Sequence, residues 1–251
     1  MKKMDITHCT NAQKFDGGYK ITAVKDAAGK PLKHVIVQTM MRIIPPQPLK
    51  PGGKITFSVD WSFNIIDATK IRSRMGYEFF EEDKNHLYAL AQWFPRMCAY
   101  TDVTGWQNKQ FLGTGEFALE FGDYLVRITA PADHIVASTG ELQNPEDVLT
   151  KTQRDRLAKA RDAKKPVFIV TLDEAKANEK EKAKGKKTWI YKADNVRDFA
   201  WCSSRKFLWD AMGMDLNGKK IMCMSYWPKE GEPLWSRYST HAVAHTVEVF
   251  S

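Results

Sequence analysis

The chain has 251 residues, which is room for one large domain or two small ones, and its 43% hydrophobic and 12% aromatic content excludes a disordered chain. Its net charge of +8 suggests an anionic partner, but acidic and basic residues interleave between Glu141 and Lys187, which indicates a solvated helical face and disfavours nucleic-acid binding. No apolar run approaches the roughly 18 residues of a membrane span. The first residues, MKKMDITHCT, lack the apolar stretch of a signal peptide.

The first half of the chain is rich in strand signals. Residues 34–43 are predicted to form one strand, which is followed by a loop of prolines and glycines. Residues 54–63, KITFSVDWSF, alternate apolar and polar side chains, as in an antiparallel strand with one face in water. Residues 77–80 and 87–93 flank the polar segment EEDKNH, and the pattern predicts a hairpin. A second hairpin is predicted over 117–128, with its turn at Gly122 and Asp123.

The pattern changes at Asn144. Residues 144–165 are predicted to form one helix, because Asn144 suits the N-cap and Pro145 the first helical position. Residues 172–187 are strongly charged and are expected to be helical or mobile. The remaining predicted elements are a short strand at VFIVT, strands at 189–192, 199–203 and 221–227, and a helix at 237–250. The sequence therefore predicts one mainly β domain over residues 1–251: an antiparallel β-sandwich or saddle with a charged helical insertion near 144–187 and a C-terminal helix.

Two histidines of the last helix form the most tempting metal-ligand pattern. His241 and His245 are one helical turn apart, and Glu248 could be a third ligand. A zinc protease of the HExxH type also needs a glutamate directly after the first histidine, as general base, and that position is Ala242. We therefore favour an ordinary amphipathic helix carrying two partly exposed histidines and predict no metal site in this chain.

Other catalytic patterns are weak or missing. GTGEFA at 113–118 matches G-x-G-x-x-A, but alternating residues follow it, which favours a β-turn or bulge over a dinucleotide site. The sequence contains no GxSxG elbow, Walker A loop or EF-hand loop. The four cysteines form no CxxC pair, and we interpret them as small buried apolar residues. No catalytic residue is predicted.

The segment 91–142, AQWFPRMCAYTDVTGWQNKQFLGTGEFALEFGDYLVRITAPADHIVASTGEL, resembles the N-terminal β domain of gluzincin zinc aminopeptidases. This is the aminopeptidase N and leukotriene-hydrolase family, and the motifs in this segment are most similar to those of its bacterial branch. The resemblance also covers 49–63, 144–161, 194–201 and 245–251, and so most of the chain from residue 35 onward.

The resemblance implies a β saddle that packs against a thermolysin-like catalytic domain. In that family an HExxH motif and a downstream glutamate hold zinc, and a GxMEN-like strand holds the substrate amine. Neither motif occurs in this sequence. The resemblance thus implies a non-catalytic part of a zinc metallo-aminopeptidase, with zinc in the parent enzyme and none in this chain. Its partners would be the catalytic domain of the same polypeptide and, through that domain, a peptide substrate.

One substrate contact is implied by the resemblance. A glutamine of the family's N-terminal domain reaches the substrate cleft, and Gln92 in AQW matches it. An amide suits this role because it can accept from an ammonium group and donate to a carbonyl. An acidic residue follows two positions later in many members and helps to hold the free amine, whereas this chain has Phe94. The alternative for Gln92 is an ordinary strand residue on a solvated face.

Two other functions fit the sequence. A stand-alone β-sandwich binding module could stack carbohydrate, or hold a protein, on Trp93, Trp106 and Trp235, although such aromatics are more often core. A basic surface over residues 151–187 could bind anionic polymers. If partner domains are missing, an exposed domain-facing patch is expected to cause self-association or poor solubility.

Overall fold

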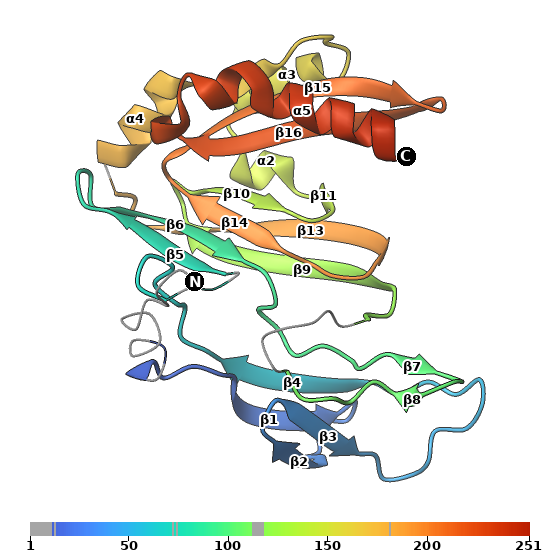
Figure 1. Cartoon of the computed structure of the whole chain (residues 1–251). Coiled ribbons are helices and arrows are strands. Elements are labelled where there is room, and N and C mark those ends of the chain that lie inside the picture. The colour runs from blue at the N-terminus through green and yellow to red at the C-terminus, as the bar shows by residue number, and fades with distance from the viewer. Residues whose placement is uncertain (1–11, 13, 72, 74, 112–117, 181) are drawn as a thin grey trace, which may run out of the picture. The chain divides into compact units, whose positions relative to one another are not determined.

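Figure 1 shows the computed structural model of the chain, which describes residues 12, 14–71, 73, 75–111, 118–180 and 182–251. Within the span predicted as one β-rich domain, the chain forms two compact units. Unit 1 comprises Met1–Ile66 and Trp93–Phe121, and unit 2 comprises Asp67–Gln92 and Gly122–Ser251.

The described part of unit 1 consists of antiparallel strand pairs. β1 (Lys20–Asp26) pairs with β4 (Phe57–Ser62), β2 (Lys33–Val37) with β3 (Met40–Ile44), and β7 (Tyr100–Thr101) with β8 (Gly105–Trp106). The alternation predicted around β4 is confirmed, because its apolar residues are half-buried and the polar residues between them are exposed.

The single strand predicted over residues 34–43 is wrong. The chain turns back at Gln38 and Thr39, so that β2 and β3 form a hairpin. Gln38 adopts a left-handed conformation with φ of 51°, and its neighbour Thr39 belongs to neither strand. The segments on either side of this turn are both apolar, so their composition predicts one continuous strand. A left-handed glutamine is not a usual turn signal, because glycine and asparagine are the common residues at positive φ.

Unit 2 contains three sheets and most of the helices. The strand order is β10-β14-β6-β5 in the first sheet, β11-β13-β9 in the second and β12-β15-β16 in the third. The elements are β5 (Gly76–Phe80), β6 (Asn85–Leu90), β9 (Gly122–Pro131), β10 (Ile135–Ser138), β11 (Glu141–Leu142), α2 (Pro145–Val148), α3 (Lys151–Ala160), β12 (Val167–Val170), α4 (Leu172–Lys180), β13 (Lys186–Val196), β14 (Trp201–Ser204), β15 (Phe207–Leu216), β16 (Lys219–Pro228), η1 (Lys229–Gly231) and α5 (Leu234–Phe250).

The third sheet is covered by helices on both faces. On one face Thr240 of α5 contacts Asp210 of β15. On the other face a Cβ added to Gly213 of β15 would lie 1.9 Å from the carbonyl oxygen of Arg161, at the end of α3. Because neighbouring strand residues point to opposite faces, the first half of β15 is buried throughout. The absence of an alternating pattern explains why β15 is not predicted from the sequence.

The single helix predicted over residues 144–165 is also wrong, since the chain forms the separate helices α2 and α3. Leu149 is extended between them and is buried. Thr150 begins α3 with a capping box, in which its side chain accepts a hydrogen bond from the Gln153 backbone and the Gln153 side chain accepts one from the Thr150 backbone. The side chain of Asn144 does not cap α2 and instead bonds to the backbone of Thr188 and Ile190 on β13.

The hairpin predicted over 117–128 is not formed by the described residues. Residues 118–121 carry no strand, and Gly122 begins β9, which pairs with β13. The GTGEFA motif lies outside the described residues except for Ala118. The hairpin predicted around EEDKNH is confirmed as β5 and β6.

The predicted fold class is confirmed. The chain is mainly β, its sheets are antiparallel, helices α2 to α4 lie in the predicted insertion, and α5 is the predicted C-terminal helix. Within the described ranges, no helix is long and apolar enough to cross a membrane.

Candidate functional site

Gln92 lies just after β6 and has a left-handed backbone with φ of 52°. This conformation is uncommon for a residue with a side chain and costs of order 1–3 kcal/mol, so the surrounding structure must hold it in place. Leu90, the last residue of β6, is buried, whereas Gln92 is half-buried. Gln92 therefore does not continue the alternation of side chains along β6. The bend in the backbone sets the direction of its side chain.

The residues after Gln92 form an aromatic cluster in unit 1. The indole nitrogen of Trp61 donates to the carbonyl oxygen of Trp93 at 3.2 Å, and the two rings are 6.4 Å apart. Phe94 packs edge-on against Trp93, with ring centres 5.1 Å apart. The side chain two positions after Gln92 therefore contributes an apolar ring to packing and supplies no carboxylate.

The sheet of β5 and β6 carries a row of aromatic side chains on one face. His86 and Tyr88 stack with ring centres 5.8 Å apart, and Tyr77 and Phe79 of β5 flank them at 6.2 and 4.7 Å. All four are half-buried. Burial lowers the pKa of His86, and the charges of Lys182 and Arg205 lower it further. His86 is thus biased towards the neutral form and behaves as one more aromatic ring.

A serine–histidine pair lies next to this row. The Nδ1 atom of His134 is 2.8 Å from the hydroxyl of Ser203, and both side chains are buried. Burial, with help from the charge of Arg205, lowers the pKa of His134 to about 4. A general base must be within reach of substrate to activate a nucleophile. Because only 2% of Ser203 is exposed, this pair fits a packing role and not acyl transfer.

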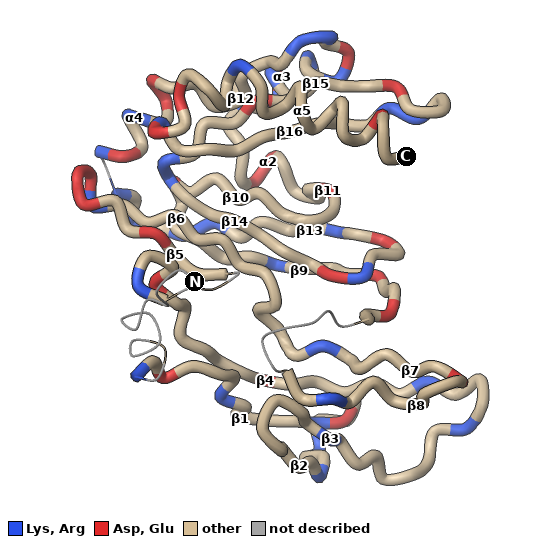
Figure 2. The backbone as a smooth tube through the Cα atoms, viewed as in Figure 1, with Lys and Arg blue, Asp and Glu red and all other residues tan. Residues whose placement is uncertain are grey.

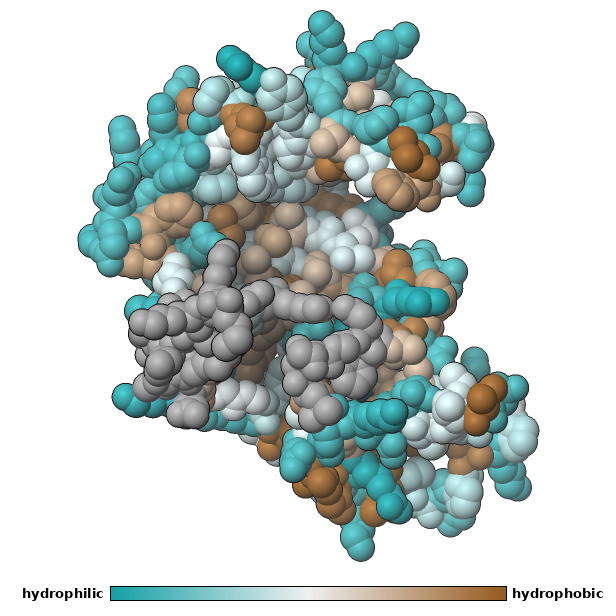
Figure 3. Space-filling model, viewed as in Figure 1, coloured by the Kyte–Doolittle hydropathy of each residue, from teal (hydrophilic) through white to brown (hydrophobic). Residues whose placement is uncertain are grey.

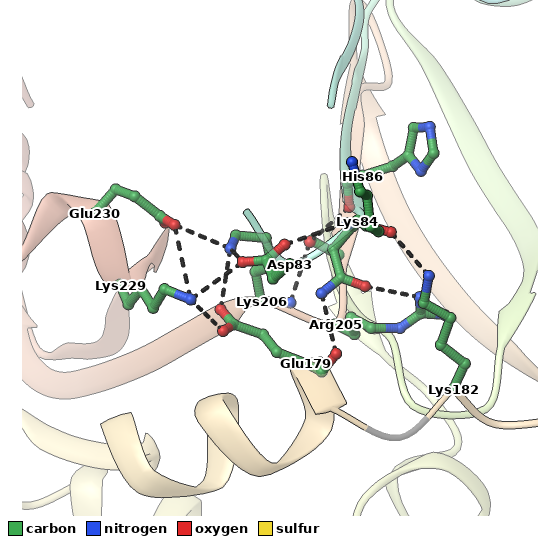
Figure 4. A network of polar contacts seen from close by, with 11 residues as sticks. Asp83, Lys84, His86, Glu179, Lys182, Arg205, Lys206, Lys229 and Glu230 are labelled. Atoms are coloured by element: carbon green, nitrogen blue, oxygen red, sulfur yellow. Dashed lines mark hydrogen bonds and ion pairs between the residues drawn. The ribbon is translucent and has the colours of Figure 1, made fainter. Parts of the chain in front are cut away.

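Figure 4 shows an ion-pair network centred on Lys206, which is fully buried. Its ammonium group contacts Asp83, Glu179 at 3.1 Å and Glu230 at 2.9 Å. Burial alone would lower the pKa of Lys206, but the hydrogen bonds to these carboxylates outweigh it and raise the pKa. Lys229 binds Asp83 at 3.1 Å and also Glu179, so that the carboxylates of Asp83 and Glu179 each meet two cations.

A second branch extends the network to the first sheet. Arg205 binds the Asp133 carboxylate at 3.1 Å and the Asn85 side-chain oxygen at 3.0 Å. Asn85 donates to the backbone carbonyl of Glu179 at 3.2 Å. The network thus joins the β5–β6 turn, the end of α4, the β14–β15 turn and η1. Since its cations and carboxylates contact one another, the network is suited to hold these segments together.

The helix α5 carries His241, His245 and Glu248, and all three are exposed. The described residues contain no group of three or more histidines, cysteines or acidic residues placed to hold a metal. The three side chains are therefore not brought together as a zinc site, and no chemical step at zinc can be assigned to them.

Cys202 and Cys223 are poor candidates for a nucleophile. Cys98, Cys202 and Cys223 are free thiols, and Cys9 lies outside the described residues. Burial raises the pKa of Cys202 and of Cys223, which keeps both thiols protonated and unreactive.

Basic and acidic residues interleave along α3 and α4, as Figure 2 shows. Lys151 binds Asp155 at 2.6 Å within α3, and Arg156 of α3 binds Glu174 of α4 at 2.7 Å. A polyanion-binding surface presents cations that are free to meet phosphates. Carboxylates such as Asp155 and Glu174 stand between the cations of this segment, which disfavours a continuous basic surface.

Apolar side chains are exposed in two places that bear on binding. In unit 1, Tyr100 and Trp106 are each 56% exposed and pack edge-on, with ring centres 5.2 Å apart. In unit 2, a pocket of about 230 Å³ lies on the outer side of α5, and Figure 3 shows hydrophobic surface near the C-terminal part of this helix. The pocket is lined by Leu234, Trp235, Tyr238, Ser239 and Ala242.

No protein-family model matches this chain, and no curated protein matches it. Among solved structures it is similar to an M1 zinc metallopeptidase from Deinococcus radiodurans, with 12% identity and a TM-score of 0.46. A mutant of that protein bound to a Tyr-Ser-Ala substrate is similar at 11% identity and a TM-score of 0.46. A two-domain M1 zinc metallopeptidase mutant bound to L-tryptophan is similar at 10% identity and a TM-score of 0.45, over 88% of this chain and 42% of that chain.

In the first two comparisons the alignment covers 85% of this chain and 38% of the other, so the chain spans less than half the length of these structures. Likenesses at this level of identity and TM-score do not establish a family.

Proposed function

We propose that this chain is a non-catalytic N-terminal portion of a zinc metallo-aminopeptidase, which lines one side of the substrate cleft and packs on a catalytic domain. The observation that carries the proposal is the amino-acid sequence of residues 91–142, which resembles the gluzincin N-terminal β domain. The mainly β architecture agrees with that resemblance.

Gln92 is the residue proposed to contact the peptide. Its left-handed backbone after β6 supports this role, because strained conformations are retained where the surrounding structure imposes a direction on a side chain. An amide in this place would bind the backbone of a peptide or its free amine. Phe94, packed against Trp93, leaves the amine without the acidic residue that many family members have. We therefore expect weak selection for a free N-terminus.

Packing on another domain is supported by the exposed apolar residues of unit 1. Val35, Ile36 and Val37 of β2 are 48%, 51% and 57% exposed. Consecutive strand residues point to opposite faces, so both faces of this hairpin present apolar surface to solvent. Such surface is typical of a face that another domain covers.

The proposal is tested first by the activity of the purified chain. With added Zn²⁺ and aminoacyl-nitroanilide or short peptide substrates, we expect no turnover, and metal-dependent hydrolysis would refute the non-catalytic assignment. The coding sequence that follows Ser251 is the second test. An HExxH motif within roughly the next hundred codons would establish the parent activity, as the motif supplies two zinc ligands and the general base.

The role of Gln92 is tested in that parent enzyme. Gln92→Ala should lower kcat/KM for peptides by roughly 10-fold, the effect of losing about one hydrogen bond, with zinc content unchanged. Gln143→Ala, a change at an exposed glutamine of unit 2, serves as the control. Equal kcat/KM values for the two variants would remove Gln92 from the substrate site.

A stand-alone binding module is the second candidate, and the exposed pair of Tyr100 and Trp106 favours it. Exposed aromatic rings on a hairpin can stack on sugar rings. A glycan array probed with the chain and with Trp106→Ala tests this function, which requires binding that the substitution abolishes.

A further inference from the structure

The turn between β15 and β16 contains the only Asn-Gly pair of the sequence, Asn217 and Gly218. These are the central residues of the turn, because Leu216 pairs with Lys219 at the end of the ladder. Both have a left-handed backbone, with φ of 52° and 77°, which is typical of a type I′ hairpin turn. Both are exposed, and Figure 1 shows the tip of this hairpin projecting from unit 2. The pair is therefore open to water.

The two residues carry the two partners of a ring closure. The side-chain carbon Cγ of Asn217 is an electrophile, and the backbone nitrogen of Gly218 is a nucleophile within reach of the same side chain. Asparagine is one of the thermolabile residues of proteins. Glycine has no Cβ that would shield its nitrogen, and a Cβ added at Gly218 would meet nothing within 4 Å. Neither a side chain nor a neighbouring segment thus crowds this nitrogen.

Another asparagine of the chain offers a matched comparison. Asn195 is also exposed and also left-handed, with φ of 56°, but the residue after it is Val196. The branched side chain of valine crowds its own backbone and restricts the approach of other groups. The two asparagines thus share backbone conformation and exposure and differ in the residue that supplies the attacking nitrogen.

The acidic residue at the end of β15 restrains this nitrogen. The backbone N–H of Gly218 donates a hydrogen bond to the Oδ1 atom of Asp215 at 3.0 Å. Ring closure requires the nitrogen to leave this bond and to approach Cγ of Asn217 in an aligned geometry. The negative charge beside it also disfavours the loss of its proton. Asp215 therefore opposes both the approach and the deprotonation.

We propose that Asn217 is a site of spontaneous deamidation and that Asp215 slows the reaction. The Gly218 nitrogen loses its proton to a base in the solvent and forms a bond to Cγ of Asn217. The bond from Cγ to the side-chain nitrogen breaks, and this nitrogen takes up a proton and leaves as ammonia. Water then opens the resulting cyclic imide at either carbonyl. One opening gives aspartate and the other gives isoaspartate, and nothing is oxidised or reduced.

The products alter the end of a central strand. Each adds a negative charge beside Asp215, and isoaspartate also inserts an extra carbon into the backbone of a short turn. Because turn length fixes the register of a hairpin, this insertion acts on the pairing of β15 with β16. β15 lies between β12 and β16 in the third sheet. The reaction requires only this turn and water and does not depend on the proposed peptidase role.

Peptide mapping by mass spectrometry tests the site. The folded, full chain is incubated at mildly alkaline pH in water labelled with heavy oxygen and is then digested. We expect aspartate and isoaspartate to accumulate at position 217, each with one labelled oxygen, and much faster than any conversion of Asn195. Isoaspartate is diagnostic, because direct hydrolysis of the side-chain amide gives aspartate alone. Conversion no faster than at Asn195, or without isoaspartate, overturns the proposal.

Two variants test the mechanism, and circular dichroism checks that each is folded. Asn217→Gln keeps the amide but would have to close a larger ring, so conversion at this position should stop. The chain accommodates glutamine in this conformation at Gln38, with φ of 51° in the β2–β3 turn. Asp215→Ala should raise the rate at Asn217 by roughly fivefold, the effect of losing one ordinary hydrogen bond.

The same measurement in concentrated urea separates the fold from the local sequence. The hydrogen bond from Gly218 to Asp215 belongs to the folded turn, so the unfolded chain should react faster than the folded chain. In urea, Asp215→Ala should react at the same rate as the unmodified chain. An unchanged or slower rate in folded Asp215→Ala overturns the restraining role of Asp215, as does an equal acceleration by this substitution in urea.

Discussion

Thr240 of α5 donates a hydrogen bond to Asp210 of β15 and thereby attaches the C-terminal helix to the sheet. Only 1% of Asp210 is exposed, and its second carboxylate oxygen has no hydrogen-bond partner among the described residues. Burial raises the pKa of Asp210, while the hydrogen bond from Thr240 and the charge of His241 act in the opposite direction. The carboxyl is therefore held in a place that favours its neutral form.

This arrangement predicts a stability that falls as the pH rises. A group whose pKa is higher in the folded state contributes stability below its unfolded pKa, and that contribution is lost as the pH rises through the folded value. Asp210→Asn keeps the shape and the oxygen that accepts from Thr240 but cannot ionise. Urea unfolding from about pH 4 to 7 should show a decline in the unfolding free energy of the unmodified chain relative to Asp210→Asn. Parallel pH profiles would contradict the assignment.

From the network around Lys206 we predict that removing this one buried charge greatly lowers the unfolding free energy. Lys206→Ala leaves the carboxylates of Asp83 and Glu179 close together without their central cation, and the expected loss in unfolding free energy is about 3–5 kcal/mol. Lys151→Ala, which breaks an exposed pair with Asp155, is the control and should cost less than about 1 kcal/mol. Urea denaturation of both variants measures the difference. Similar small losses would show that Lys206 is not a structural centre.

Strands and helices with one solvated face could be predicted from the sequence, because burial then leaves a period in the residue pattern. The apolar residues of β4 repeat every second position, and α5 has a helical repeat of apolar residues. β15 gave no such signal, since helices cover both of its faces and its buried residues run consecutively from Phe207 to Ala211. The break between α2 and α3 does have a local signal, the Thr150–Gln153 capping box, which a continuous helical pattern obscures.

The charged network could not be predicted from sequence. Asp83, Glu179, Lys206 and Glu230 come from turns and helix ends that are far apart along the chain, and only the fold brings them together. The left-handed backbone of Gln92 could not be predicted from the sequence either, because glutamine has no preference for positive φ.

The contact between Gly213 and Arg161 predicts that β15 tolerates no side chain at this position. A Cβ at Gly213 would lie 1.9 Å from the Arg161 carbonyl oxygen, so the end of α3 would have to move. Overpacking of this kind costs about 1–3 kcal/mol, and Gly213→Ala should lose that much unfolding free energy. At Gly185 the nearest atom would be 4.0 Å away, so Gly185→Ala should change it by less than about 0.5 kcal/mol. Equal effects in urea denaturation would contradict close packing of α3 on the sheet.

His134 predicts a loss of stability in acid. Because its pKa is lowered from 6.5 to about 4, the unfolded chain binds a proton in this range that the folded chain does not. The stability contributed at neutral pH is therefore lost as the pH falls through this window, by up to roughly 3 kcal/mol for a shift of this size. His134→Gln retains a side chain that can bond to Ser203 but does not titrate, so its unfolding free energy should vary less between pH 6.5 and 4 than that of the unmodified chain. His34→Gln, at a half-buried histidine of β2, controls for histidine loss in general. If both variants follow the pH profile of the unmodified chain, burial of neutral His134 does not govern acid stability.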